Sequence, residues 1–189
     1  MNAAPAFHTR RLSVAEFAAE LAAFRFTRRV GAVHMHHTWS PNHAEWRGEA
    51  SVVAMRDYHV HTNGWADIGQ HVTIAPDAYV WTGRDWNRPP CSDAGDNGTS
   101  AAGPFMFETV GNFDVGHDHL AGPQRWAVLE VIARVQRRFG LAVESLRFHR
   151  ELPGCVKSCP GTGVSKTDVL EAVRATHRRL ALGPTVAGR

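Results

Sequence analysis

The sequence predicts a single α/β domain in which a central mixed β-sheet is flanked by helices. Short β-prone segments alternate with amphipathic helical segments around one core, which is typical of this class. The 189 residues are enough for one domain that buries a sizeable core without disulfide bonds. Hydrophobic residues make up 43% of the chain and charged residues 21%, as in ordinary soluble globular proteins.

Four segments have the apolar spacing or the end signals of helices. The first begins with Ser13 and Glu16, the spacing of a capping box. The third is the clearest, because Pro123 stands at its start and Gly140 just beyond its end. The helices are expected at residues 13–25, 51–61, 123–139 and 165–180.

Five β-prone runs supply the strands of the predicted sheet. Residues 76–78 (PDA) separate two of the runs and predict a hairpin turn. Residues 84–103 form a long turn-rich stretch, and such a loop on a compact domain is often functional. The strands are expected at residues 30–35, 70–75, 79–82, 105–110 and 145–148.

Charge, hydropathy and cysteine content limit the function classes. The net charge of +3 and pI of about 9.1 could favour anionic cell-wall polymers but do not indicate nucleic-acid binding. No apolar run approaches the roughly 18–20 residues that span a bilayer, and residues 1–11 lack the pattern of a secretory signal. Three cysteines are too few for a disulfide framework, which leaves metal binding, packing or an incidental pair.

Three metal-binding side chains lie at expected strand ends or in the loops that follow them. His36 and His149 each end a predicted strand, and Cys159 lies in the loop after His149. Imidazole nitrogen and thiolate sulfur suit zinc, and three protein ligands leave a fourth position for water. The spacing alone equally allows a packed thiol and two polar histidines without a metal.

Four motifs give the chain a resemblance to a known family. The motifs are residues 33–38 (VHMHHT), 63–71 (NGWADIGQH), 79–84 (YVWTGR) and 149–161 (HRELPGCVKSCPG). In this order they resemble the zinc amidases of the phage lysozyme-amidase and peptidoglycan-recognition-protein family. The resemblance covers about residues 30–175. It implies one Zn²⁺ per chain and hydrolysis of the amide bond between N-acetylmuramic acid and L-alanine in peptidoglycan.

The resemblance also implies which side chains bind the metal. The family's zinc ligands fall on His36, His149 and Cys159. His34 and His37 remain rival ligands, and alternation along the strand puts only His34 on the face of His36. Cys155 is interpreted as a packing residue, although it could compete with Cys159 or form a redox pair with it.

Two further positions carry the expected acid–base and electrostatic chemistry. Lys157 matches the family's catalytic lysine, and it is one of only two lysines among 21 basic residues. The phage branch has a tyrosine where this chain has Gln70, which cannot exchange a proton in this pH range. The muropeptide-recycling branch instead uses a strand glutamate before a glycine, and Glu108 matches it. Burial among apolar neighbours would raise the pKa of Glu108 towards a useful value.

Some weaker signals concern the substrate groove and the surroundings of the metal. His71 and Asp67 could support either the zinc site or the hairpin, and the sequence does not separate the two. Four side chains could line a groove for sugar and peptide: Trp39, Trp81, Trp86 and Asn87.

The leading expectation is therefore a cell-wall lytic or recycling amidase of phage or prophage origin, such as an endolysin. Residues 1–29 are expected to form an N-terminal helical extension, 30–182 the amidase domain and 183–189 a flexible tail. The expected partner is peptidoglycan or a muropeptide, without nucleic acid or membrane insertion. Synthesis is expected in the cytoplasm, with action on the wall after holin-type release. Two alternatives are a non-catalytic peptidoglycan-binding module and a redox or structural zinc protein that uses Cys155 and Cys159.

Overall fold

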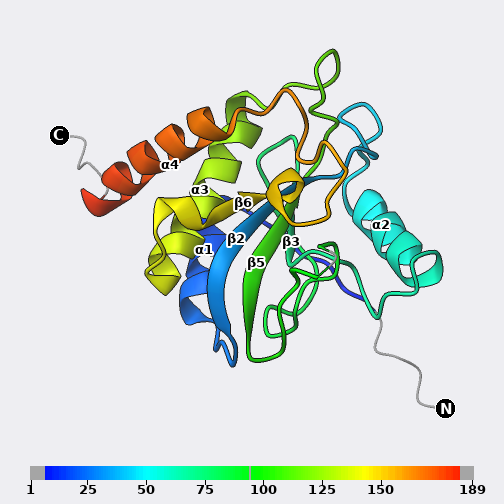
Figure 1. The fold of residues 1–189 in the computed structure, drawn as a ribbon, viewed down its shortest axis with the longest axis horizontal. Coiled ribbons are helices and arrows are strands. Elements are labelled where there is room, and N and C mark those ends of the chain that lie inside the picture. The colour runs from blue at the N-terminus through cyan, green and yellow to red at the C-terminus, as the bar shows by residue number, and fades with distance from the viewer. Residues whose placement is uncertain (1–6, 94, 184–189) are drawn as a thin grey trace.

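The computed structural model describes residues 7–93 and 95–183, which form a six-stranded mixed sheet with helices around it (Figure 1). The order of strands across the sheet is β1-β4-β3-β5-β2-β6. β2 pairs in parallel with β5 and β6, β3 pairs in parallel with β5, and β4 is antiparallel to β1 and β3. The strands are β1 (Arg11–Leu12), β2 (Arg29–His37), β3 (Val72–Ile74), β4 (Val80–Thr82), β5 (Ala102–Thr109) and β6 (Leu146–Phe148).

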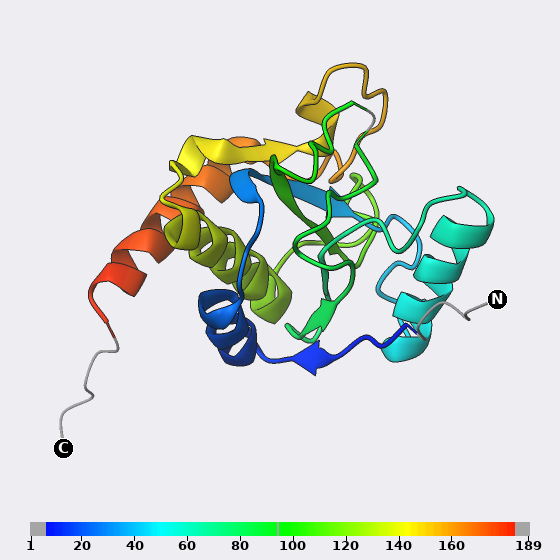
Figure 2. The same ribbon diagram turned by 90° about the horizontal axis from the view of Figure 1, so that it is seen from below.

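Three of the described helices gather on one side of the sheet, and α2 lies on the other (Figures 1 and 2). α3 lies in the centre of the first group and contacts both α1 and α4. The helices are α1 (Val14–Ala23), α2 (Glu49–His61), α3 (Gly122–Phe139) and α4 (Lys166–Ala181). Two short 3-10 turns flank β6, at Val143–Ser145 and His149–Glu151.

The main core lies between the sheet and the α1–α3–α4 layer. On β2, Val33 and Met35 belong to this core, whereas the alternate residues His34 and His36 do not. β5 repeats the pattern, since Phe107 is in the core and its neighbour Glu108 is not. His34, His36 and Glu108 therefore share the sheet face opposite α3.

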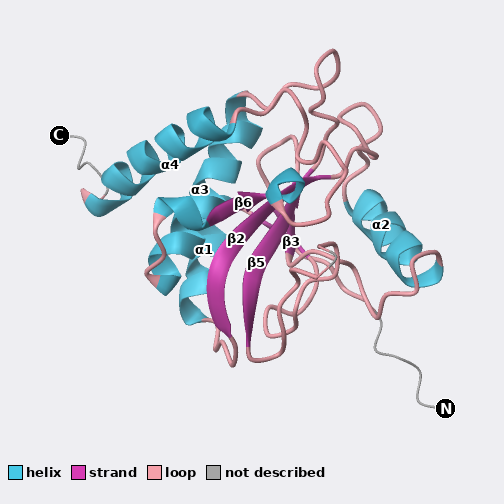
Figure 3. Ribbon diagram, in the orientation of Figure 1, coloured by secondary structure: helices cyan, strands magenta, loops and turns pink. Residues whose placement is uncertain are grey.

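The carboxyl ends of β2 and β5 lie side by side, because the two strands run in parallel and in register. Figure 3 shows long loops gathering around this end of the sheet. In open sheets with parallel strands, ligands bind at the carboxyl ends, where loops supply varied side chains. The fold thus places the polar residues of both strands where a site is expected.

The helix-end signals of the sequence are confirmed. The side chains of Ser13 and Glu16 form the predicted capping box at α1. Gly140 ends α3 with φ of 64°, a left-handed conformation that favours glycine. Ser165 caps α4 by accepting a hydrogen bond from the backbone N–H of Asp168.

The strands are also close to prediction, with one addition. The predicted hairpin is present as β3 and β4, joined through residues 75–79. β2 extends further than expected and includes His36 and His37. β1 was not predicted, since a two-residue strand is too short to show alternation; it pairs with β4.

The N-terminal segment shares the core of the rest of the chain. Phe17 and Leu21 of α1 are fully buried in the main core. Of the expected N-terminal extension, residues 1–6 lie outside the described residues, as does the expected tail at 183–189 except Gly183. Among the helices that the structure describes, none has the length and apolar character needed to cross a membrane.

Candidate active site

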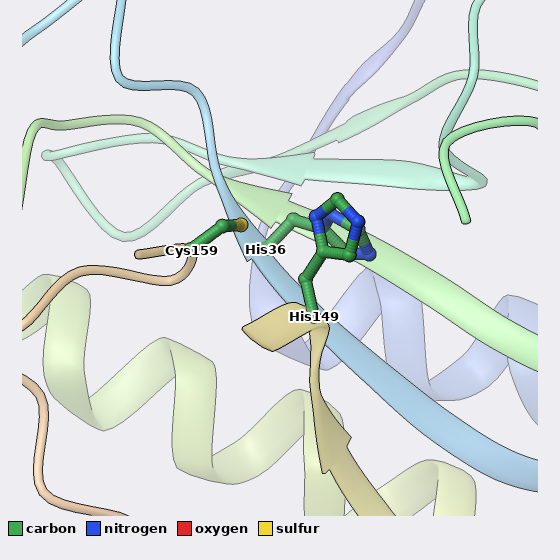
Figure 4. A group of neighbouring side chains, drawn as sticks. All are labelled: His36, His149 and Cys159. Carbon is green, nitrogen blue, oxygen red and sulfur yellow. The ribbon is translucent and has the colours of Figure 1, made fainter. Parts of the chain in front are cut away.

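The structure brings together the three predicted metal ligands. His36 lies near the carboxyl end of β2, His149 directly follows β6, and Cys159 lies in the loop after it. All three side chains are buried, and one donor atom from each lies within 4.8 Å of the other two. The imidazole rings of His36 and His149 lie 4.3 Å apart between centroids, and the sulfur of Cys159 points towards them (Figure 4).

Arg150 holds the loop that carries Cys159 in place. Its backbone N–H donates to the carbonyl of Cys159 at 2.8 Å. Its guanidinium donates to the carbonyls of Gly161 at 2.6 Å and Val164 at 2.7 Å. The residue next to one ligand thus fixes the segment that supplies another. Arg150 belongs to the fourth motif, but no role could be assigned to it from the sequence, because its hydrogen bonds to the loop become visible only in three dimensions.

The donor set fits a zinc ion. Two imidazoles and one thiolate are preferred zinc ligands, and three of them leave the coordination shell open. Burial and the neighbouring charge of His36 lower the pKa of His149 to about 4, so its imidazole is neutral, the form that binds metals. Burial raises the pKa of the Cys159 thiol, so a nearby cation is needed to stabilise its thiolate.

Glu108 lies beside His36 on the neighbouring strand. The two residues are paired in the parallel register of β2 and β5. Burial raises the pKa of Glu108 to about 8, against the opposing effect of the positive charge of Lys157. The carboxyl group lines the same cleft as His36, where it can give or take a proton.

Lys157 is exposed at the rim of this cleft, two residues before Cys159. Its charge is close enough to Glu108 to affect the pKa of that carboxyl group. Lys157 therefore brings a positive charge to the cleft that Glu108 and the candidate ligands also line.

The rival histidines have other partners. Nδ1 of His34 lies 2.6 Å from Oδ2 of Asp93. His37 faces the opposite side of the strand, where its Nδ1 accepts a hydrogen bond from the backbone N–H of Phe113. Neither belongs to the mutually close group of donors in the described part of the chain.

Asp93 is a buried neighbour of the metal centre that sequence reasoning missed. Its side chain is fully buried, and its Oδ1 lies 2.9 Å from Nε2 of His36 and 3.6 Å from Nε2 of His149. Burial opposes its ionisation, but the hydrogen bond with His34 and the nearby imidazole of His36 hold the pKa of Asp93 below its usual range. Its only signal in the sequence was membership of the long loop at residues 84–103.

Cys155 lies outside the donor group. Its sulfur makes only a long contact of 3.9 Å, to the backbone carbonyl of Lys157. Both Cys155 and Cys159 are free thiols, so the structure holds no disulfide between them.

A cleft of about 960 Å³ opens onto the three candidate metal ligands. Its lining includes the loop after β2, with the exposed Trp39, and also Tyr58 and Trp65. Aromatic walls of this kind bind the apolar faces of sugars and leave polar groups at the floor for chemistry. The cleft is large enough for a ligand of several units.

Three of the four expected groove residues lie elsewhere, so that expectation was wrong for them. Trp86 is buried in the main core, where it packs on Phe17. Trp81 is buried beneath α2, and Asn87 binds the backbone of residues 25 and 27. Only Trp39 lines the cleft. Trp81 and Trp86 instead fill hydrophobic clusters of the core.

The polar residues around β3 have structural partners. His71 is fully buried: its Nδ1 accepts from the backbone N–H of Met106, and its Nε2 donates to the carbonyl of Arg88. Asp67 binds the side chain of Arg56. Gln70 is fully buried and donates to Thr73, so it does not reach the cleft.

Residues 26–162 match the Amidase_2 family, described as N-acetylmuramoyl-L-alanine amidase. The chain belongs to this family. Among curated proteins it is similar to the human N-acetylmuramoyl-L-alanine amidase, at 32% identity over 87 residues. That match covers 44% of this chain and only 14% of the human protein. Peptidoglycan-recognition protein SC1a of Drosophila melanogaster is 26% identical over 132 residues, 69% of this chain and 67% of that protein.

Solved structures give the same fold. The Ph2119 endolysin of a Thermus scotoductus bacteriophage is 27% identical with a TM-score of 0.60, over 79% of this chain and 87% of the endolysin. Drosophila PGRP-LB matches at a TM-score of 0.60 and 22% identity, over 74% of this chain and 79% of that chain. The family and these relatives support the sequence-based expectation of an amidase.

Proposed function

We propose that this chain is a zinc-dependent amidase that cuts between N-acetylmuramic acid and L-alanine in peptidoglycan. The observation that carries the proposal is the convergence of His36, His149 and Cys159 at the floor of a cleft, with a buried carboxyl group beside them. Family membership indicates which bond is cut, since the family is described as N-acetylmuramoyl-L-alanine amidase.

His36, His149 and Cys159 would hold the ion. A zinc ion held there supplies Lewis-acid polarisation of the scissile carbonyl and activation of water. Because the described donor group contains three protein ligands, it leaves space for a substrate oxygen or water. This supports hydrolysis over the structural zinc alternative.

Glu108 would transfer the protons, and Lys157 would stabilise the negative charge that develops on the substrate. Glu108 takes a proton from the attacking water and returns it to the departing amine nitrogen, because its carboxyl group is buried beside His36. Lys157 offers an ammonium group to the oxygen on which negative charge develops. A compact ammonium group fits beside a metal where a planar guanidinium would be crowded.

The cleft supports a glycopeptide substrate. Trp39 and Trp65 provide aromatic surface in the cleft that the candidate ligands line. One related solved structure, of a Drosophila PGRP-LB mutant, is described as a complex with tracheal cytotoxin, and this agrees with a muropeptide as ligand here. The similarity to a phage endolysin agrees with a lytic role at the cell wall.

The proposal is tested by incubating the purified protein with intact peptidoglycan and with soluble muropeptide, each with and without a zinc chelator. Mass spectrometry should find new free amino termini on L-alanine, and they should disappear with the chelator and return with added zinc. New reducing sugar ends would instead identify a glycosidase. Binding to peptidoglycan without any cleavage would favour the non-catalytic binding module.

A further inference from the structure

One buried carboxylate contacts three imidazoles around the metal centre. Oδ2 of Asp93 lies 2.6 Å from Nδ1 of His34, and Oδ1 faces Nε2 of both His36 and His149. The side chain of Asp93 has no exposed surface, while those of His34 and His36 are 6% and 2% exposed. A charge buried this deeply is costly unless its neighbours compensate for it.

The contact of Asp93 with His36 occupies one of the two nitrogens of that imidazole. Within the described residues, Nε2 of His36 and Oδ1 of Asp93 are both buried, and neither forms a hydrogen bond. The two atoms lie 2.9 Å apart, within hydrogen-bonding distance, so a small rotation of either side chain lets the imidazole N–H donate to the carboxylate. A neutral imidazole carries one N–H, and this contact places it on Nε2 and leaves the lone pair on Nδ1.

The orientation of the rings agrees with this assignment. In Figure 4 each imidazole has one nitrogen on the side away from Cys159. The group of mutually close donors consists of His36, His149 and Cys159, and the carboxylate of Asp93 is not part of it in the described part of the chain. Asp93 thus lies behind the imidazoles and not among the ligands.

We propose that Asp93 is a positioning residue for the metal centre: its carboxylate accepts the Nε2 proton of His36, and more weakly that of His149, so that both rings offer Nδ1 to zinc. This inference rests on the proposed zinc site. A carboxylate behind a ligating imidazole fixes the tautomer and ring orientation and increases the basicity of the ligand. His34, although not a ligand itself, anchors the second carboxylate oxygen.

The loop between β4 and β5 is folded to present this carboxylate. The backbone N–H of Asp93 donates to the side chain of Asn97 at 3.0 Å, and the N–H of Asp96 donates to the carbonyl of Asp93 at 3.1 Å. The turn therefore closes on itself and directs the side chain of Asp93 inwards. This gives the long loop a role in the metal centre.

The first test reads the tautomer directly. Long-range proton–nitrogen NMR of the zinc-loaded, ¹⁵N-histidine-labelled protein should show His36 with its proton on Nε2 and the metal on Nδ1. A proton on Nδ1 of His36 would overturn the proposal. This measurement uses the wild-type protein and does not depend on the folding of any variant.

The second test compares Asp93→Asn with Asp96→Asn, which removes the same charge from the same loop. Zinc affinity is measured by competition with a chromophoric chelator. Asp93→Asn should bind zinc about 10- to 100-fold more weakly, and Asp96→Asn should bind like the wild type. Equal affinities of the two variants would overturn the proposal. If the wild type binds zinc with the expected tautomer but leaves peptidoglycan intact, the proposed function fails while this inference stands.

Discussion

His36 and Glu108 are register partners on the adjacent parallel strands β2 and β5. This pairing places a candidate zinc ligand and a buried carboxyl group on one face of the sheet, close to the carboxyl ends of both strands. Backbone hydrogen bonds fix their separation, which is the kind of rigid support that a reacting pair of groups needs.

Replacing Glu108 by glutamine should abolish proton transfer while keeping the shape of the side chain. We expect kcat on muropeptide to fall by about 100-fold or more. Zinc content, measured by inductively coupled plasma mass spectrometry, should remain at one ion per chain. Turnover near that of the wild type, at full zinc content, would exclude Glu108 as general base.

Lys157→Met should lower kcat more than it raises KM, because the ammonium group is expected to act on charge that develops during the reaction. A loss of about 10- to 1,000-fold in kcat is expected. Lys157→Arg should recover only part of it, since the guanidinium is larger and planar. Steady-state kinetics on a soluble muropeptide provides both constants. A change confined to KM would instead indicate that Lys157 only binds substrate.

Cys155 and Cys159 lie in the same loop after His149, which we call the ligand loop, and they provide a test variant and its control. Cys159→Ser should lose bound zinc and activity together, because the buried sulfur is one of three donors. Cys155→Ser should retain both, since Cys155 lies outside the donor group and forms no disulfide. Loss of zinc from Cys155→Ser would show that the ligand set has been assigned to the wrong cysteine.

His71 should make the fold sensitive to acid. Burial lowers the pKa of His71 to about 3 from 6.5, so the folded protein keeps the imidazole neutral while the unfolded chain becomes protonated. The stabilisation is therefore complete above pH 6.5 and is lost as the pH falls towards 3. This one residue contributes a slope of up to about 1.4 kcal/mol per pH unit in that window.

The measurement is the free energy of unfolding in urea from pH 4 to pH 8, with a chelator present so that zinc release does not contribute. His71→Gln should be less stable at pH 7 and should show a shallower decline with acid. A slope identical to that of the wild type would mean that His71 titrates normally in the folded protein.

Local signals in the sequence predicted much of the fold. The capping box at Ser13 and the helix-end signals at Pro123 and Gly140 depend only on residues close in sequence, so they can be recognised without knowing the tertiary structure. β1 depends instead on pairing with β4, from which it is separated by about 70 residues of chain. A two-residue strand stabilised by a distant partner leaves no periodic pattern.

The candidate site divides along the same line. The candidate ligands lie in sequence motifs that can be recognised from the sequence: His36, His149 and Cys159. Asp93, in contrast, is recognised only from its contacts in the structure. For the tryptophans, in contrast, the residue type suggested a site that the structure does not confirm. Aromatic rings suit a sugar-binding groove, but Trp81 and Trp86 pack in the core, and the sequence does not show which of the two environments a ring occupies.

His149 directly follows β6, a short strand of three residues at the edge of the sheet that pairs with β2 alone. Such a margin opens more readily than the centre. A metal bound by His36, His149 and Cys159 would cross-link β2 to segments that lie more than a hundred residues later in the chain. Zinc should therefore protect the ligand loop from proteases, and a protein stripped of zinc should be nicked there first.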